Sequence, residues 1–355
     1  MQIRRKLPLS VALVLSVLFA AASATAPAQQ SQAPAAQQRQ LPTQLSDSAL
    51  WSIISEFSEQ EQSFTTYMVS NETFYPNLVA TLLSMNLKGG AYVGVAPEQN
   101  YHYIASLRPQ IAFVLDIRRQ AVIQHLMYKA IFELSANRAD FISLLFTKPR
   151  PPGISDTAGA FETWTAFWNI VTDTTKFTSN FTRILDQLKK KHNFPLSAYD
   201  SSLLHYTYES FYRSGPNIVS NGGSSTNDAT ATTFGNLTSA RDFGGVERSF
   251  LANDEGYQVV RQLHLKNLVI PIVGDFAGQH ALRAIGRYLH EHNVQLSAFY
   301  TSNVETYLQR AGTTGAFYQN VATLPLHSRS VMIRGVSQGR ICNLQTVIAT
   351  GYPGC

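Results

Sequence analysis

Residues 89–116, GGAYVGVAPEQNYHYIASLRPQIAFVLD, decide the fold that we expect for this chain. They contain two short apolar runs, Ala91–Val95 and Ile111–Leu115, each typical of a buried strand, with a polar segment and a short helix predicted between them. A strand, a helix and a strand in this order predict two neighbouring parallel strands. Gly94 and Asp116 then lie at the carboxyl ends of these strands, where open α/β sheets bind nucleotide-like ligands.

The composition is that of a globular chain. The 355 residues are 45% hydrophobic and 14% charged, which argues against a disordered or fibrous protein. The formal net charge of +5 is small for this length, and Lys and Arg are scattered apart from the run at 189–191. Nucleic-acid binding therefore receives little support.

Residues 1–26 are typical of an export signal. Arg4, Arg5 and Lys6 give a positive start, and the apolar run Leu9–Ala22 is followed by small residues suited to cleavage. At about 14 residues, this run is too short for a comfortable membrane span. We expect an exported protein, periplasmic or secreted, without a membrane span in the mature chain; the general and the twin-arginine export routes both stay open.

The rest of the chain divides by composition. Residues 27–45 are rich in Ala, Gln and Pro, and we expect a disordered linker because they cannot bury enough apolar surface to offset the entropy of ordering. Residues 46–355 are expected to form a single α/β domain. Within it, aromatic-rich patterns predict a helical insertion at about 141–215, and the Gly-, Ser- and Thr-rich residues at about 220–245 predict a flexible loop.

Further periodic segments flank this core. Apolar residues at three- and four-residue steps from Leu50 to Met68 predict one helix after Asp47, a good capping residue. Asp275 and Asn303 follow two later strands that we expect beside the first one. The predicted later strands are Leu268–Val273, Val294–Tyr300, Ser330–Ile333 and Thr346–Ala349.

Cys342 and Cys355 are the two cysteines of the chain. We favour a disulfide between them, worth about 3 kcal/mol on the loop-entropy estimate, over two free thiols. Two cysteines cannot make a structural zinc site of the thiolate type, and the sequence contains no HExxH, GxSxG or Walker pattern. Neither a metal site nor a catalytic nucleophile is predicted.

The order of elements resembles the class I S-adenosylmethionine-dependent methyltransferase superfamily. The segments VGVAPEQNYHYI, VLDIRR, VGDFAG and AFYTSNVETYL, which start at residues 93, 114, 273 and 298, also resemble an uncharacterised group of exported bacterial proteins. The resemblance implies a Rossmann-like, mostly parallel sheet of methyltransferase type, with a helical N-terminal segment and a helical insertion. It also implies S-adenosylmethionine as the cofactor.

The resemblance assigns roles to particular residues. In the superfamily a Gly-rich turn after the first strand approaches the amino-acid part of the cofactor, and an acidic residue at the end of the second strand holds the ribose hydroxyls. Here Gly94, Glu98 and Asn100 match the turn, Asp116 matches the acidic residue, and Asp275 matches the end of the fourth strand as a further cofactor-binding candidate. A fixed carboxylate suits a ribose diol because it accepts two hydrogen bonds.

The rim after the next strand supplies candidates for substrate binding, namely Tyr300, Asn303 and Glu305. The pattern departs from the superfamily at the first turn, where Ala96 and Pro97 stand in place of glycine and Pro97 has no amide donor.

Structural roles stay open for these residues. Arg118 or Arg119 could satisfy Asp116, Glu98 could cap the short helix, and Asp275 could cap the helix that follows it. Two functions remain. The first is a protein that binds S-adenosylmethionine or a related nucleoside-like ligand, as a methyltransferase of unknown acceptor with no assigned catalytic residue. The second is a non-catalytic exported binding protein whose helical insertion or flexible loop contacts a partner.

Overall fold

The computed structural model describes residues 39–225, 232–335, 339–350 and 355. The predicted export signal, residues 1–26, and most of the predicted linker lie outside them. Within the described ranges no helix combines the length and the hydropathy needed to cross a bilayer.

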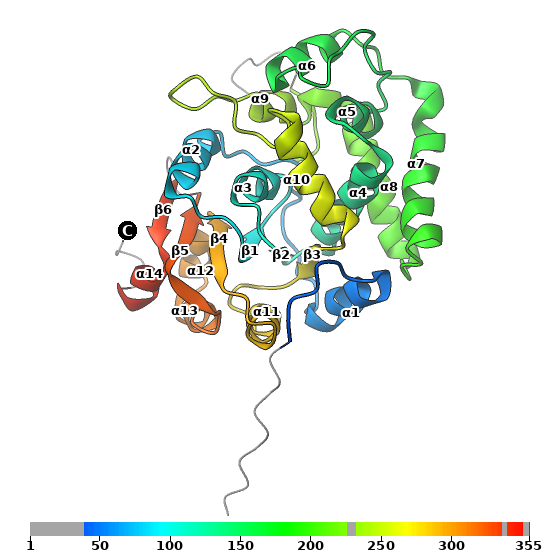
Figure 1. The fold of residues 1–355 in the computed structure, drawn as a ribbon. Coiled ribbons are helices and arrows are strands. Elements are labelled where there is room, and N and C mark those ends of the chain that lie inside the picture. The colour runs from blue at the N-terminus through cyan, green and yellow to red at the C-terminus, as the bar shows by residue number, and fades with distance from the viewer. Residues whose placement is uncertain (1–38, 226–231, 336–338, 351–354) are drawn as a thin grey trace, which may run out of the picture. The chain divides into compact units, whose positions relative to one another are not determined.

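A six-stranded, mostly parallel sheet forms the centre of the fold (Figure 1). The spatial order is β3-β2-β1-β4-β5-β6; the first five are parallel, and β6 runs antiparallel to β5. The strand order reverses between β1 and β4, so this point is the topological switch of the sheet. The strands are β1 (Ala91–Val95), β2 (Ile111–Asp116), β3 (Val269–Val273), β4 (Leu296–Ser302), β5 (Leu326–Arg334) and β6 (Arg340–Asn343).

The predicted α/β class with a mostly parallel sheet is thereby confirmed. Val95 pairs with Leu115, and Asp116 pairs with Val273, so β1, β2 and β3 end at the same edge. All five residues of β1 are buried, as are all six of β2. Strands covered on both faces read as continuous apolar runs, which is why the sequence revealed them.

Helices cover both faces of the sheet. Figure 1 shows α2, α3, α4 and α10 on one face and α1, α11 and α13 on the other; α5, α7 and α8 pack on the outer side of α4, and α6 and α9 lie at the top of this view. The helices are α1 (Asp47–Phe57), α2 (Tyr75–Met85), α3 (Gln99–Leu107), α4 (Arg119–Leu134), α5 (Arg138–Phe146), α6 (Ala160–Trp168), α7 (Phe177–Asp186), α8 (Ala198–Ser214), α9 (Phe234–Thr238), α10 (Asp254–Leu265), α11 (Ala281–Glu291), α12 (Val304–Arg310), α13 (Thr314–Val321) and α14 (Leu344–Thr350).

Two strand predictions were wrong. Thr346–Ala349 lies in α14, whose first turn is capped by the Asn343 side chain, which accepts from the backbone N–H of Thr346 at 3.1 Å. Asp275 follows the third strand and not the fourth, and β3 lies beside β2 and not beside β1. The described residues between β2 and β3 include helices but no further strand. The strand before Asp275 is therefore the third of the sheet, and the resemblance had made it the fourth.

The other differences concern helix ends and loops. The single helix expected up to Met68 stops at Phe57, and an extended segment follows. The expected loop at about 220–245 contains α9, and its residues 226–231 lie outside the described part of the chain. The structure joins Cys342 of β6 to Cys355 by a disulfide, with the Cα atoms 5.9 Å apart.

Candidate functional site

A cavity of about 330 Å³ lies at the carboxyl ends of β1 to β4, and we call it the carboxyl-edge cavity. Its walls come from the turns that follow these strands, from α12 and from the extended segment after α1. The lining residues used below are Gln62, Phe64, Tyr67, Asn71, Asp116, Arg118, Asp275, Phe276, Tyr300, Ser302, Asn303, Tyr307, Ala311 and Thr313.

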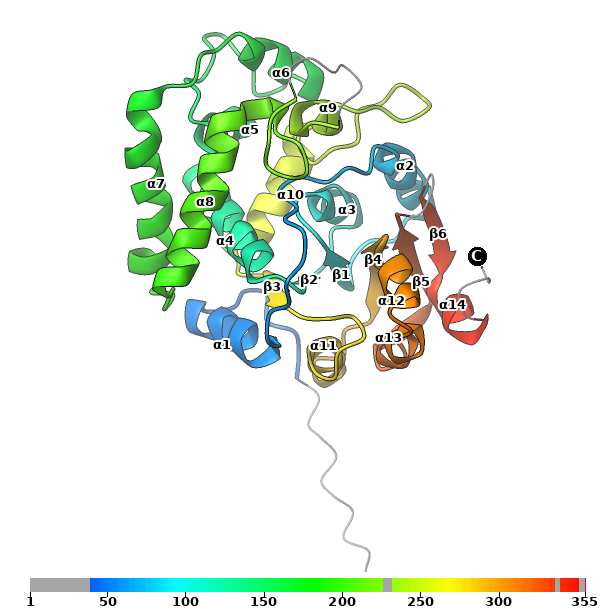
Figure 2. The ribbon, with the colours of Figure 1, turned by 180° about the vertical axis from the view of Figure 1, so that it is seen from behind.

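The extended segment, residues 58–70, is termed the strap. Its backbone N–H groups at Glu59 and Gln62 donate to the carbonyls of Val273 and Ile117, both at 2.8 Å. These bonds lay the strap across the ends of β3 and β2, and Figure 2 shows the segment between α1 and α2 passing in front of the sheet. The helix ends at Phe57 because these tertiary bonds compete with helix continuation, which a periodic sequence pattern cannot reveal.

Asp116 is paired with Arg118 inside the cavity wall. One carboxylate oxygen accepts the backbone N–H of Arg118 at 3.0 Å and its Nε at 2.8 Å, and the other accepts Nη2 at 2.6 Å. Nη1 donates to the carbonyl of Thr65 at 3.0 Å, and the guanidinium lies 5.6 Å from the ring centre of Tyr67. Asp116 therefore lines the cavity as half of a buried ion pair that also holds the strap.

The turn after β1 is filled from within. The side-chain amide of Asn100 donates to the carbonyls of residues 95–97 at 2.7 to 2.8 Å. A Cβ at Gly94 would lie 2.0 Å from the Asn100 Oδ1 and 2.7 Å from the Tyr92 hydroxyl. Gly94 therefore makes room for Asn100. Neither residue lines the cavity, although both were expected to bind the cofactor.

Glu98 is also outside the cavity. It is completely buried at the start of α3, makes no capping bond there, and accepts the backbone N–H of Ser70 at 3.0 Å. Its Oε2 has no hydrogen-bond partner among the described residues. Burial raises the pKa of the Glu98 carboxyl group to about 7. Its role is to anchor the end of the strap.

Asp275 lines the cavity from the turn after β3. Its carboxylate accepts the Ala277 N–H at 2.9 Å and the Gln62 side-chain amide at 3.2 Å. It does not cap α11; Glu59 accepts the N–H groups of His280 and Ala281 at 2.8 and 2.9 Å. Glu59 is a residue that sequence analysis missed, because its bonds reach more than 200 positions along the chain.

Two of the three rim candidates line the cavity. Tyr300 is 1% exposed and Asn303 is exposed. Glu305 was expected on the same rim, but it does not line the cavity and is only 1% exposed. Its carboxylate accepts Nε of Arg334 at 2.6 Å and the Tyr318 hydroxyl at 3.0 Å. A buried carboxylate paired in this way stabilises the packing of α12 on β5 and is not free to bind a substrate.

Aromatic side chains of the strap meet α12 over the cavity. The rings of Phe64 and Tyr307 pack edge to face with centres 5.2 Å apart, and Phe64 also lies 6.4 Å from Tyr67. Burial, together with the neighbouring Tyr307, raises the pKa of Tyr67. The strap and α12 thus form an aromatic outer wall of the cavity. The sequence did not predict this wall because one continuous helix was expected through residues 58–68.

A half-buried acid lies behind the rim of β4. Ser302, which lines the cavity, donates to the Glu72 carboxylate. Burial raises the pKa of Glu72, against hydrogen bonds from Ser302 and Tyr300 that lower it. Ser302 has φ 51°, a left-handed conformation that costs a non-glycine residue energy and is common near functional sites. Neither residue was among the sequence candidates.

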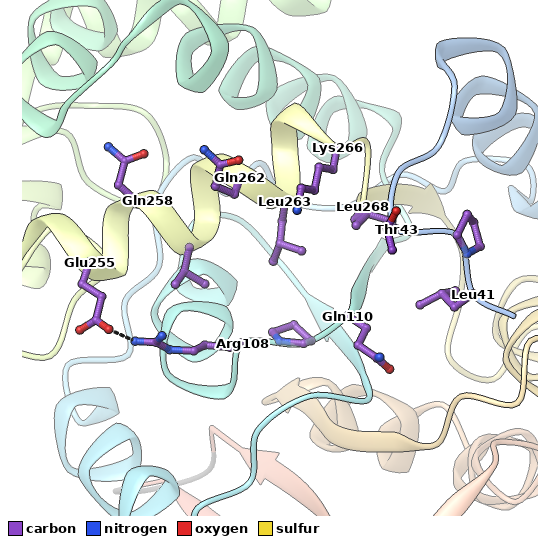
Figure 3. Close-up of a pocket in the computed structure, with 13 residues that line it drawn as sticks. Leu41, Thr43, Arg108, Gln110, Glu255, Gln258, Gln262, Leu263, Lys266 and Leu268 are labelled. Atoms are coloured by element: carbon purple, nitrogen blue, oxygen red, sulfur yellow. Dashed lines mark hydrogen bonds and ion pairs between the residues drawn. The ribbon is translucent and has the colours of Figure 1, made fainter.

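A second pocket lies at the opposite edge of the sheet, near the starts of β2 and β3. This amino-edge pocket has a volume of about 500 Å³. Figure 3 shows Leu263 and Leu268 at its floor, and Arg108 and Glu255 joined on its rim by an ion pair. The side chains of this pair are 41% and 70% exposed, so the pocket lacks buried polar groups of the kind that orient a ligand.

The fold and the site define an α/β protein with a ligand-sized cavity at the carboxyl edge of a mostly parallel sheet. A family model described as a domain of unknown function (DUF7790) matches residues 67–151 and 225–351, and the chain belongs to this family. The matched residues include all six strands, whereas α6 to α8 fall between the two matched parts. A search of curated proteins found no match.

Proposed function

We propose that the carboxyl-edge cavity binds S-adenosylmethionine or a related nucleoside-like ligand, and that methyl transfer to an acceptor is the reaction it serves. One observation carries this proposal: Asp116, Asp275 and Asn303 lie at or just after the ends of three different parallel strands and line a single cavity beside the switch point. In open α/β sheets this crevice is the usual ligand site. The resemblance to the methyltransferase superfamily agrees with it.

The residues present fit such a ligand. A carboxylate has about four lone-pair sites, and Arg118 occupies three on Asp116, which leaves one on Oδ2 for a ribose hydroxyl. Asp275 and Asn303 supply further polar groups, and the aromatic outer wall supplies flat surfaces for a base. The turn after β1 contributes less than in the superfamily because Asn100 occupies its carbonyls and Pro97 lacks an amide proton.

S-adenosylmethionine, when bound, supplies the methyl group to be transferred. The chain itself positions the acceptor and excludes water, and such alignment accounts for much of the rate enhancement in reactions of this type. The strap and α12 close the outer side of the cavity through the Phe64–Tyr307 contact.

Calorimetry with an occluding variant tests the proposal. Ala311 is exposed at the end of α12 and lines the cavity, so Ala311→Trp fills the site with little effect on the core. Titration with S-adenosylmethionine and S-adenosylhomocysteine should give heat with the wild type and an affinity at least ten times lower with Ala311→Trp. Gln309→Trp, at an exposed position of α12 that does not line the cavity, should bind as the wild type does. No heat with either ligand would falsify the proposal.

A second candidate is a non-catalytic exported protein that binds a partner through its helical insertion or through the loop at about 220–245. The observation that favours it is a set of exposed aromatic side chains: Phe161 and Trp168 on one face of α6 are 59% and 60% exposed, and Phe243 is 86% exposed. Asp116, already paired with Arg118, also agrees with a site that has lost its ligand. This candidate predicts no heat with either nucleoside, and loss of partner capture from an envelope extract in Phe161→Ser/Trp168→Ser.

Export is part of both candidates. Expression of the full chain in a bacterial host should yield a mature protein whose mass lacks about the first 26 residues, as expected for cleavage at the small residues of the signal. Retention of the N-terminus in the cytoplasmic fraction would contradict export.

A further inference from the structure

We propose that the carboxyl-edge cavity selects a cationic ligand, with a sulfonium or ammonium group, over a neutral ligand of the same shape. This inference rests on the proposed function and goes further, because it names the charge that the site recognises. Two independent features of the cavity support it: an excess of carboxylates and a wall of aromatic rings.

The charge of the site is opposite to that of the chain. The formal net charge of the chain is +5, yet the charged residues that line the cavity are Asp116, Asp275 and Arg118, and Arg118 neutralises Asp116. This leaves Asp275 as an uncompensated carboxylate in the wall. Among the described residues its partners are the neutral donors of Gln62 and Ala277.

Acids of the strap extend this negative region. Glu59 accepts the backbone N–H of Asp275 at 2.9 Å, and within the described ranges its carboxylate bonds to backbone N–H groups and not to a cation. Glu61 accepts the backbone N–H of Arg119 at 3.3 Å, while the guanidinium of Arg119 pairs with Asp200. Glu59 and Glu61 do not line the cavity themselves, but their charges add to the negative potential around Asp275, which favours ligands of the opposite sign.

The aromatic wall suits the same ligand. Phe64, Tyr67 and Tyr307 all line the cavity, and the negative face of an aromatic ring attracts a cation within about 6 Å. Guanidinium groups already lie near two of these rings, that of Arg118 at 5.6 Å from Tyr67 and that of Arg310 at 6.0 Å from Tyr307, so a cationic ligand must use the ring faces that these groups leave open. A sulfonium or ammonium group between this wall and Asp275 would meet favourable partners on both sides.

The test compares ligands that differ in charge. S-adenosylmethionine carries a sulfonium, sinefungin carries an ammonium at the equivalent place, and S-adenosylhomocysteine has a neutral sulfur there. We expect calorimetry to show that both cations bind at least ten times more tightly than the neutral analogue. Asp275→Asn and Tyr307→Leu should each reduce this ratio at least threefold, whereas Asp186→Asn, a partly exposed acid on α7, should leave it unchanged.

The outcomes separate the two proposals. If S-adenosylhomocysteine binds as tightly as the cations, or more tightly, cation selection is overturned while nucleoside binding stands. If no nucleoside binds, the proposed function fails, and trimethylsulfonium chloride then decides the charge preference alone. Its binding, measured by nuclear magnetic resonance and weakened by Asp275→Asn, supports cation selection; its failure to bind overturns it.

Discussion

The two edges of the sheet are built from the same strands but differ in chemistry. The amino-edge pocket is the larger, at about 500 Å³ against about 330 Å³, and its one ion pair, Arg108–Glu255, lies in solvent. At the carboxyl edge, four strand ends and the strap bring buried or partly buried polar groups together, including the Asp116–Arg118 pair at 7% and 8% exposure. Volume alone does not choose between the two edges; the convergence of polar groups is what favours the carboxyl edge as the candidate site.

The difference has a physical origin. Burying a charge is costly unless it is paired and hydrogen-bonded, so a chain retains buried charges where packing and bonding satisfy them. At the carboxyl edge Asp116 and Arg118 satisfy each other inside the wall, whereas the amino edge pairs its charges in water.

The largest effect is expected for Arg118→Met. The substitution leaves Asp116 buried without its guanidinium and frees the strap at Thr65, so the free energy of unfolding should fall by about 3 to 5 kcal/mol. Urea unfolding measures this loss. Asp116→Asn/Arg118→Met should recover part of the stability, because the unpaired charge is removed. A loss below about 1 kcal/mol in the single variant would show that water already reaches Asp116.

Glu98→Gln should change how stability depends on pH. In the folded protein burial raises the pKa of Glu98 from its ordinary 4.5 to about 7, so the folded state holds the proton more tightly than the unfolded state. The contribution of Glu98 to the free energy of unfolding is fully present below pH 4.5. It is lost as the pH rises through about 7, a loss on the order of 3 kcal/mol.

Glu98→Gln should remove that decline while keeping an acceptor for the Ser70 N–H. Urea unfolding at several pH values between 4 and 8 gives the comparison. Glu255→Gln is the matched control at the amino edge, because the hydrogen bond from Arg108 lowers the pKa of this exposed group. An equal decline in wild type and Glu98→Gln would assign the pH dependence to other groups.

Gly94→Ala tests the filled turn. Its Cβ would enter the space of Asn100 and Tyr92, so we expect destabilisation of about 1 to 3 kcal/mol from overpacking. Gly315→Ala is the control, since a Cβ there meets nothing within 4 Å in α13 and should be neutral or slightly stabilising. Equal thermal midpoints for the wild type and Gly94→Ala would refute the close approach of Asn100.

The smallest effect is expected at the amino edge. Arg108→Met breaks an ion pair whose side chains are 41% and 70% exposed, and such pairs contribute about 0 to 1 kcal/mol. Urea unfolding of this variant beside Arg118→Met compares the two edges directly. If Arg108→Met were as damaging as Arg118→Met, the contrast between the edges would disappear.

The sequence revealed the elements whose signal is local. Strands β1 and β2 are continuous apolar runs because both faces of the sheet are covered, and their parallel order follows from the helix between them. Strand β6 was missed because Arg340–Asn343 is short, lies at the sheet edge and is only partly buried. The strap was missed because its apolar spacing imitates a helix.

The candidate site divides in the same way. Asp116, Asp275 and Asn303 could be placed at one cavity from the sequence because they lie at or just after strand ends, and the carboxyl ends of parallel strands meet at one edge. Glu305 was misassigned because its partner, Arg334, comes from a different strand and no spacing rule foretells that pair. Glu59 acts on residues more than 200 positions away, so a single sequence carries no signal for it.

A crystal structure of the protein with S-adenosylmethionine tests the central claim most directly. We expect ligand density in the carboxyl-edge cavity, with the nucleoside near Asp116 and the sulfonium between Asp275 and the ring of Tyr307. Density in the amino-edge pocket, or a carboxyl-edge cavity left without ligand at saturating concentration, would contradict it.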